Sequence, residues 1–305
     1  MPSSSHTFTF CPQGPFDLLY QNQYFNGWPL IEGGQTLVMA FPVEGWQGSA
    51  AVTLRQDPSG GLEGGIHGPP DVWERARQQA LAAMSLDEDG GSWSAVGTRD
   101  ALVAELQVKY HHMRPTLFHS PYEAASAFII GHRITIGQGR KLRAGMAREF
   151  GETIEVAGEG FFAFPSPQEL LTLEVYPGLN ETKINRLHSV ARAALEGWLD
   201  RAYLRSLDDE VALAKLETLP GIGPFFSQGI LYRGAGGKDG FTRDEMTYQV
   251  MRRAYGLDDD TSEEALLAIA EQWQPYRMWV NVLLHVWASE AVNRAKPGFS
   301  HGHAV

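Results

Sequence analysis

The chain has 305 residues, of which 43% are apolar and 20% charged, a composition typical of a globular protein long enough for two domains. It has no long uncharged apolar run, which argues against a transmembrane helix, and its single cysteine, Cys11, excludes an internal disulfide and a four-cysteine iron–sulfur cluster. The first ten residues lack the pattern of a secretory signal, so we expect a cytoplasmic protein with no membrane partner. Because the net charge is −11, any contact with a polyanion must use a local basic face.

Residues 1–105 predict an N-terminal α/β sheet domain. Phe8 and Phe10 alternate with threonines, and later short runs are rich in strand-forming residues. The expected elements are strands at 37–41 and 50–54, a turn at 57–61 and a helix at 72–84.

From residue 106 the apolar spacing becomes helical, which predicts an all-α domain over 106–295 and a tail over 296–305. The expected helices lie at 122–130, 136–150, 167–173, 181–198 and 276–292. The fold class is therefore α+β, with an antiparallel sheet domain followed by a helical domain.

The most informative motif is Leu-Pro-Gly-Ile-Gly-Pro-Phe at 219–225, between two segments with helical apolar spacing. It predicts a helix-hairpin-helix. Gly221 and Gly223 carry no side chain, so the backbone amides of Gly221, Ile222 and Gly223 can approach a phosphate closely. The alternative is an ordinary turn between packed helices, because Pro-Gly and Gly-Pro pairs are common in turns.

Asp244 follows the hairpin after one intervening helix, where its carboxylate could reach the sugar of a bound nucleotide. A fixed carboxylate can stabilise the positive charge that develops on a sugar as its glycosidic bond breaks, and can orient the attacking water. Asp244 also precedes a helical pattern that includes Met246 and Val250, so it can be a helix N-cap, a role compatible with the first. Glu245 is the second candidate, if the register is shifted by one residue.

Several short motifs share their order and spacing with the helix-hairpin-helix DNA glycosylases, and the chain resembles the 3-methyladenine DNA glycosylase II family. The matching residues are Ser-Pro-Tyr-Glu-Ala at 120–124, Gly-His-Arg-Ile-Thr at 131–135, Phe-Pro-Ser-Pro at 164–167, Lys183-Ile184, Arg186-Leu187, the 219–225 motif, Arg-Gly-Ala-Gly at 233–236, Tyr-Gly-Leu at 255–257, Trp273 with Pro-Tyr-Arg at 275–277, and Leu-His-Val-Trp at 284–287. The resemblance implies two helical lobes with a cleft between them.

The resemblance also assigns roles. Members that cut the strand carry a lysine where this chain has Phe225, which cannot form a Schiff base, so a monofunctional hydrolase is implied; Lys238 lies outside that position. Phe225 and Trp287 match aromatic positions of the family's base pocket, and Trp279 is a further candidate by position. Stacked aromatics attract a cationic alkylated base. Each of them can instead be an ordinary core residue.

One departure from the family concerns the residues after Gly131. The family usually has a glutamine followed by a residue that wedges into the gap left by a flipped base, whereas this chain has His132 and Arg133. Arg133 could fill the gap and also contact phosphate. The other candidates for a basic face are Arg140, Lys141, Arg143, Lys183 and Arg186.

The resemblance thus implies a monofunctional DNA glycosylase that flips out and excises alkylated bases of the 3-methyladenine type in base excision repair. The expected partner is double-stranded DNA with a damaged base, and the expected state is a monomer with nucleoid-associated activity. We expect no metal and no cofactor, apart from a monovalent cation that could sit at the hairpin. The alternatives are a glycosylase for oxidised bases and a damage-binding protein without chemistry.

Overall fold

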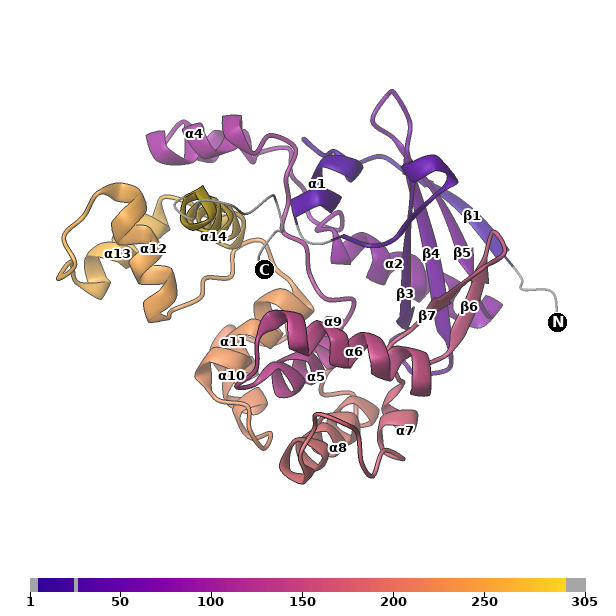
Figure 1. Ribbon diagram of the computed structural model, residues 1–305. Helices are drawn as coiled ribbons and strands as arrows, with labels where there is room; N and C mark the ends of the chain where they lie inside the picture. Colours follow the sequence, from indigo (N-terminus) through magenta and orange to yellow (C-terminus); the bar gives the residue numbers. More distant parts are fainter. Residues whose placement is uncertain (1–4, 25–26, 295–305) are drawn as a thin grey trace.

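A computed structural model describes residues 5–24 and 27–294 (Figure 1). Its N-terminal part is a five-stranded antiparallel sheet with the order β1-β5-β4-β3-β2. The strands are β1 (Ser5–Phe10), β2 (Leu30–Ile31), β3 (Thr36–Pro42), β4 (Ser49–Gln56) and β5 (Leu62–His67). Short helical elements in this part are α1 (Leu18–Tyr24), η1 (Glu32–Gly34), η2 (Pro70–Val72), α2 (Trp73–Ala83) and α3 (Ser94–Gly97). The expected strands at 37–41 and 50–54 and the helix at 72–84 are confirmed.

Strand β5 has no counterpart among the predicted strands, because Gly64 and Gly65 weaken its strand pattern. It nevertheless pairs along its whole length with both β1 and β4. A side chain at position 64 would have its Cβ 2.2 Å from the ring of Phe8, so the glycine permits that ring to lie flat on the sheet.

Two groups of helices follow the sheet, as Figure 1 shows. The first lobe contains α5 (Pro121–Gly131), α6 (Ile136–Phe150), α7 (Pro167–Leu170), α8 (Glu181–Leu195), α9 (Arg201–Arg205), α10 (Asp209–Glu217), α11 (Pro224–Gly229) and the π-helical segment η3 (Ile230–Ala235). The second lobe contains α12 (Glu245–Tyr255), α13 (Glu263–Glu271) and α14 (Arg277–Arg294), joined by α4 (Ala101–Lys109). The α+β class with its N-terminal sheet and helical part is therefore confirmed.

Helix α4 packs against α14 although the two are far apart in the sequence. Lys109 at the end of α4 pairs with Glu290 of α14 at 2.6 Å. Helix α4, which precedes the first lobe in the sequence, therefore packs as part of the second lobe.

The expectation that everything after residue 105 is helical is wrong at one place. Strands β6 (Thr153–Val156) and β7 (Glu159–Phe162) form a hairpin. Its buried residues Ile154 and Phe161 form one apolar cluster with Val38 and Ala51 of the N-terminal sheet. The alternation of apolar and polar residues covers only four residues in each strand, which is too short to be distinguished from the helical spacing in the surrounding sequence.

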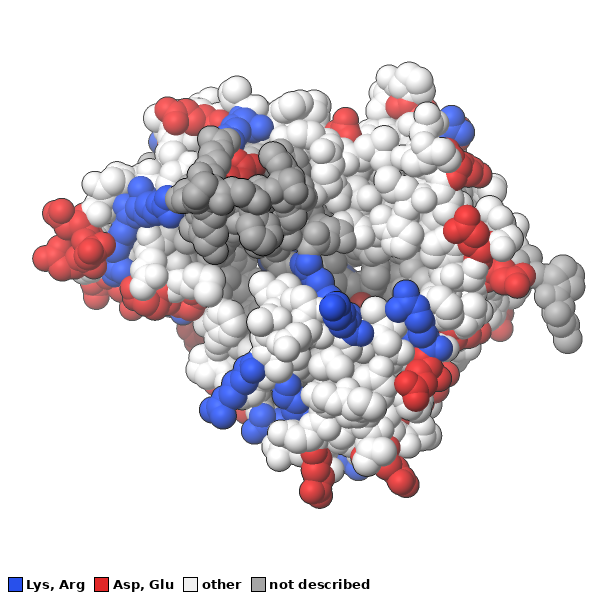
Figure 2. Space-filling model, in the orientation of Figure 1, with Lys and Arg blue, Asp and Glu red and all other residues white. Residues whose placement is uncertain are grey.

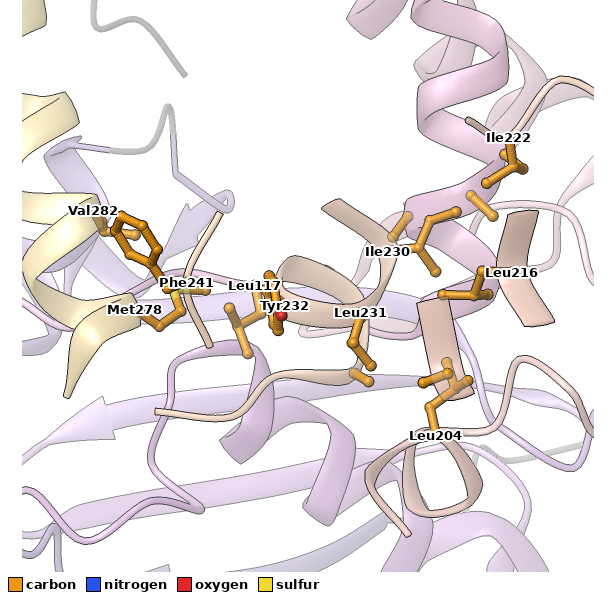
Figure 3. Close-up of a cluster of buried hydrophobic side chains, with 14 of the residues drawn as sticks. Leu117, Leu204, Leu216, Ile222, Ile230, Leu231, Tyr232, Phe241, Met278 and Val282 are labelled. Atoms are coloured by element: carbon orange, nitrogen blue, oxygen red, sulfur yellow. The ribbon is translucent and has the colours of Figure 1, made fainter. Parts of the chain in front are cut away.

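A single apolar core continues through both helical lobes. Figure 3 shows it running from Ile222 past Ile230 and Leu231 to Phe241 and Met278. No helix within the described residues is both long and apolar enough to cross a bilayer. The expected tail at 296–305 lies outside the described residues.

Candidate functional site

The 219–225 motif forms the predicted turn, between α10 and α11. Ile222 is only 4% exposed and points into the core beside Leu216 and Ile230 (Figure 3). Gly221 and Gly223 on either side of it are exposed, and Pro224 opens α11. The isoleucine therefore anchors the turn while the glycines bring the backbone to the surface. The Ile222 amide itself donates to the Leu219 carbonyl at 3.0 Å, contrary to the expectation that it faces a phosphate.

The two glycines of the turn are required for different reasons. Gly221 has a φ of +85°, and a Cβ there would lie 2.6 Å from the side chain of Arg186. Gly223 is extended at the N-cap of α11, with nothing within 4 Å of a Cβ position. Among the described residues no protein acceptor is recorded for the amides of Gly221 and Gly223. Exposed amides at a helix start favour an anion.

Asp244 is the N-cap of α12, as the helical pattern after it predicts. Its carboxylate accepts from the Thr247 amide at 2.9 Å and from the Thr247 hydroxyl at 3.3 Å. The preceding residue is held by Gln228 of α11, whose side chain accepts from the Arg243 amide at 2.7 Å. A side chain of the hairpin's second helix thus fixes the segment that carries the carboxylate.

Glu245, the second candidate for the catalytic acid, points elsewhere. It pairs with the largely buried Arg252 of the same helix at 3.0 Å and accepts from the exposed Gln249. Its side chain is 65% exposed, whereas Asp244 is half-buried. A partly buried carboxylate interacts more strongly with a nearby charge than a fully solvated one does, because the local dielectric constant is lower. The geometry therefore favours Asp244 over Glu245 as the candidate catalytic acid.

His285 of α14 lies beside this carboxylate and was not among the predicted site residues. Its Nε2 is 3.3 Å from the Thr247 hydroxyl. Burial lowers the pKa of His285, the negative charge of Asp244 opposes this shift, and Arg233 adds to it. The sequence does contain a signal: Asn281 and His285 are polar residues four apart in the otherwise apolar stretch 278–288 of α14, and such spacing places both on one face.

The three aromatic pocket candidates differ in exposure. Phe225 is 51% exposed, and its ring lies 5.9 Å from that of Phe226. Trp287 is half-buried, with the Arg253 guanidinium 5.5 Å from its ring centroid. Both therefore keep ring surface open to a ligand.

Trp279 is a core residue instead. It is 2% exposed, its ring lies 5.4 Å from Trp93 and 5.0 Å from Tyr276, and the Arg114 guanidinium covers it at 5.2 Å. No face of this indole is open to stack on a base, so we remove Trp279 from the pocket candidates.

Aromatic side chains also gather behind Phe225. Phe226 stacks on Phe128 at 5.1 Å, and His132 meets the edge of Phe226 at 5.8 Å. A Cβ at position 229 would lie 2.4 Å from the Phe128 ring, so Gly229 gives this ring its place against α11. Partial loss of solvent lowers the pKa of His132, and the nearby charges of Arg133, Arg186 and Lys183 lower it further, which favours the neutral ring at pH 7.

Arg133 occupies the turn between α5 and α6 with a φ of +59°, a left-handed conformation that is unusual for arginine. Its side chain is exposed. The neighbouring Lys183 donates to the Ile130 carbonyl at 2.7 Å and so caps the end of α5 rather than standing free. A strained, exposed residue in a supported turn is typical of a functional position.

Two more of the predicted basic residues pack against neighbouring groups of the protein. Arg143 lies 5.6 Å above the Phe118 ring, and Arg186 packs against Gly221. Figure 2 shows Lys and Arg side chains gathered over the first lobe and beside the central hollow, with acidic side chains mostly toward the periphery. An acidic protein can therefore present a locally basic face.

Lys238, which lies outside the hairpin motif in the sequence, is packed over an aromatic ring. Its ammonium is 4.9 Å from the ring centroid of Tyr276, and its carbonyl accepts from the Met278 amide. It forms part of a surface pocket of about 360 Å³ with Arg205 and Arg277. That pocket and a second one of about 540 Å³ beside Trp46 are lined by neither Asp244, Phe225 nor Trp287.

Comparison with known proteins gives relatives in both sequence and fold. No protein-family model matches the chain. DNA-3-methyladenine glycosylase 2 of Escherichia coli K12 is 30% identical over 173 residues, which cover 55% of this chain and 57% of that protein. The chain therefore matches little more than half the length of this curated relative.

Solved structures match over nearly the whole chain. A 3-methyladenine DNA-glycosylase from Archaeoglobus fulgidus has a TM-score of 0.75 at 17% identity, covering 93% of this chain and 98% of that one. An 8-oxoguanine glycosylase/lyase from Clostridium acetobutylicum, bound to double-stranded DNA, has a TM-score of 0.67 at 16% identity, covering 96% and 100%. At such identities these likenesses show a shared fold alone.

Proposed function

We propose that this chain is a helix-hairpin-helix DNA glycosylase similar to the 3-methyladenine glycosylase II family, and that it hydrolyses the glycosidic bond of alkylated bases in DNA. The observation that carries the proposal is Asp244, a half-buried carboxylate at a helix N-cap, fixed by Gln228 of the hairpin's second helix through the neighbouring Arg243 amide. The protein that this chain resembles in sequence is named a DNA-3-methyladenine glycosylase. Proteins of similar fold include a 3-methyladenine DNA-glycosylase and an 8-oxoguanine glycosylase/lyase.

Different residues of the site suit different parts of the DNA. The exposed amides at Gly221 and Gly223 suit one phosphate, and they carry no sequence information, so they fix the position of the strand. Arg133, at the tip of the α5–α6 turn, suits the gap left when a base leaves the stack. Phe225 and Trp287 offer ring faces to the extruded base.

In the chemical step the C1′–N bond breaks and its electron pair leaves with the base. An alkylated base carries a positive charge on its ring, so it departs as a neutral molecule and needs little help from an acid. Positive charge then develops on the sugar, where the Asp244 carboxylate stabilises it. Water adds to C1′ and gives its proton to the carboxylate or to solvent.

We also propose that the enzyme is monofunctional. Phe225 stands at the hairpin position where a lysine would be needed as a nucleophile, and Lys238 is held over Tyr276. No amine at either place is offered to the sugar, so water is the attacking group and the strand stays intact.

The test is base release from oligonucleotides that carry 3-methyladenine, 7-methylguanine, hypoxanthine, ethenoadenine or 8-oxoguanine, with and without alkali. Release of methylated bases, with strand breaks only after alkali, supports the proposal. Preferred release of 8-oxoguanine would replace it with an oxidised-base glycosylase. DNA binding without any release would replace it with a damage-binding protein.

A further inference from the structure

One face of α14 contacts the chain on both sides of Asp244. Asn281 Nδ2 donates to the Thr242 hydroxyl at 3.4 Å, two residues before the aspartate. His285, one turn later, contacts the Thr247 hydroxyl at 3.3 Å, three residues after it. Helix α14 therefore holds the segment 242–247 at two points that flank the carboxylate.

Thr247 connects His285 to Asp244. Thr247 is only 1% exposed, so its hydroxyl has no access to bulk water. Its Oγ1 lies 3.3 Å from Asp244 Oδ2 and 3.3 Å from His285 Nε2. A hydroxyl has one proton to donate, and a carboxylate can only accept. If Thr247 donates to Asp244, it must accept from His285, and His285 must then carry its proton on Nε2.

The charges around His285 are consistent with a neutral ring. The groups facing it are Asp244 at the start of α12 and Arg233 of η3, and burial lowers the pKa of His285 despite the carboxylate. Near pH 7 the imidazole is therefore uncharged, and it has one N–H to place. The Thr247 hydroxyl is the acceptor that the structure offers to Nε2.

We propose that His285 is a positioning residue for base excision, acting through the chain His285 Nε2–H to Thr247 Oγ1 and Thr247 Oγ1–H to Asp244 Oδ2. The inference rests on the proposed role of Asp244. The Thr247 amide already fixes one carboxylate oxygen at 2.9 Å, and the hydroxyl chain fixes the other. Two contacts set the plane of the carboxylate, which a single cap bond leaves free to rotate.

Losing this alignment should reduce the chemical step more than DNA binding, because neither His285 nor Thr247 is placed to touch a phosphate. A displacement of about 1 Å at a catalytic group costs on the order of 100-fold. We therefore expect Thr247→Val and His285→Leu each to lower kcat by about 10- to 100-fold, with KM and affinity for DNA within about twofold of wild type. Thr247→Ser keeps the hydroxyl and should restore most of the rate.

Val286→Ala is the matched control for general damage to α14, since Val286 is 5% exposed in the core but takes no part in the chain. It should lower the melting temperature without a comparable loss of kcat. The double variant Thr247→Val with His285→Leu should be no slower than the slower single variant, because both remove the same chain. Losses of kcat that follow melting temperature across all variants, or no rescue by serine, would overturn the inference.

Nitrogen NMR of the histidine rings gives a readout that does not depend on catalysis. We expect His285 as the neutral tautomer with its proton on Nε2, and a changed Nε2 signal in Thr247→Val. A proton on Nδ1 would overturn the inference. A wild-type protein that releases no base from any of the oligonucleotides refutes the proposed function instead, and the tautomer then still decides whether the hydrogen-bond chain exists.

Discussion

Replacing Asp244 with asparagine should separate its structural role from its chemical one. Asparagine keeps an acceptor oxygen for the Thr247 amide, and asparagine and aspartate are equally good N-caps, so the fold should be retained. The lost charge at the start of α12 costs about 0.3 to 1 kcal/mol of stability. The chemical cost is larger. A carboxylate about 4 Å from a developing sugar cation, at an effective dielectric constant of about 20, contributes about 4 kcal/mol, which is about a thousandfold in rate.

The assay is single-turnover base release from a methylated oligonucleotide, with DNA affinity and melting temperature measured on the same preparations. Glu245→Gln is the control, because it removes a neighbouring, exposed carboxylate that pairs with Arg252 within α12. It should keep nearly the wild-type rate. If Asp244→Asn stays within tenfold of wild type while Glu245→Gln is inactive, the assignment of the acid is wrong by one residue.

Four further predictions concern strand cutting, the two glycines of the hairpin and a buried acid. Borohydride should trap no covalent complex with damaged DNA, since Phe225 replaces the lysine of strand-cutting relatives; a trapped adduct that disappears in Lys238→Ala would refute this. Gly223→Glu should weaken binding to damaged and undamaged DNA alike, by about tenfold or more, with little change in melting temperature because the space around Gly223 is open; unchanged affinity would make the hairpin a purely structural turn. Gly221→Ala should instead destabilise the fold by about 1–2 kcal/mol, because its φ of +85° is left-handed. Burial raises the pKa of Glu44 to about 7, so the native state holds a proton that the unfolded chain releases, and stability should fall as pH rises from about 4.5 to about 7; the melting temperature of Glu44→Gln relative to wild type should be higher near pH 8 than near pH 5, and equal differences at both would refute it.

The sequence was sufficient for the features that depend on local spacing. The α+β class, the hairpin at 219–225 and the N-cap at Asp244 all follow from turn residues and from apolar periods of two or 3.6, which are properties of neighbouring residues. For the same reason the helices at 136–150 and 181–198 were placed to within a few residues. The sequence also shows directly that position 225 is a phenylalanine and not a lysine. The borohydride test decides what this means for strand cutting.

The tertiary structure decided everything that depends on which side chains meet. Trp279 and Trp287 are both tryptophans on one helix, and only packing against Trp93 and Arg114 buries the first while leaving the second half-open. Strand β5 pairs with β1, which is distant in the sequence, and the β6–β7 hairpin packs its apolar side chains on Val38 and Ala51 of the N-terminal sheet. Neither contact can be predicted from a glycine-rich or four-residue segment alone. His285 lies 38 residues from Thr247, so no local pattern joins them. The carboxylate could be found from spacing, but the contacts that orient it exist only once α14 packs beside α12.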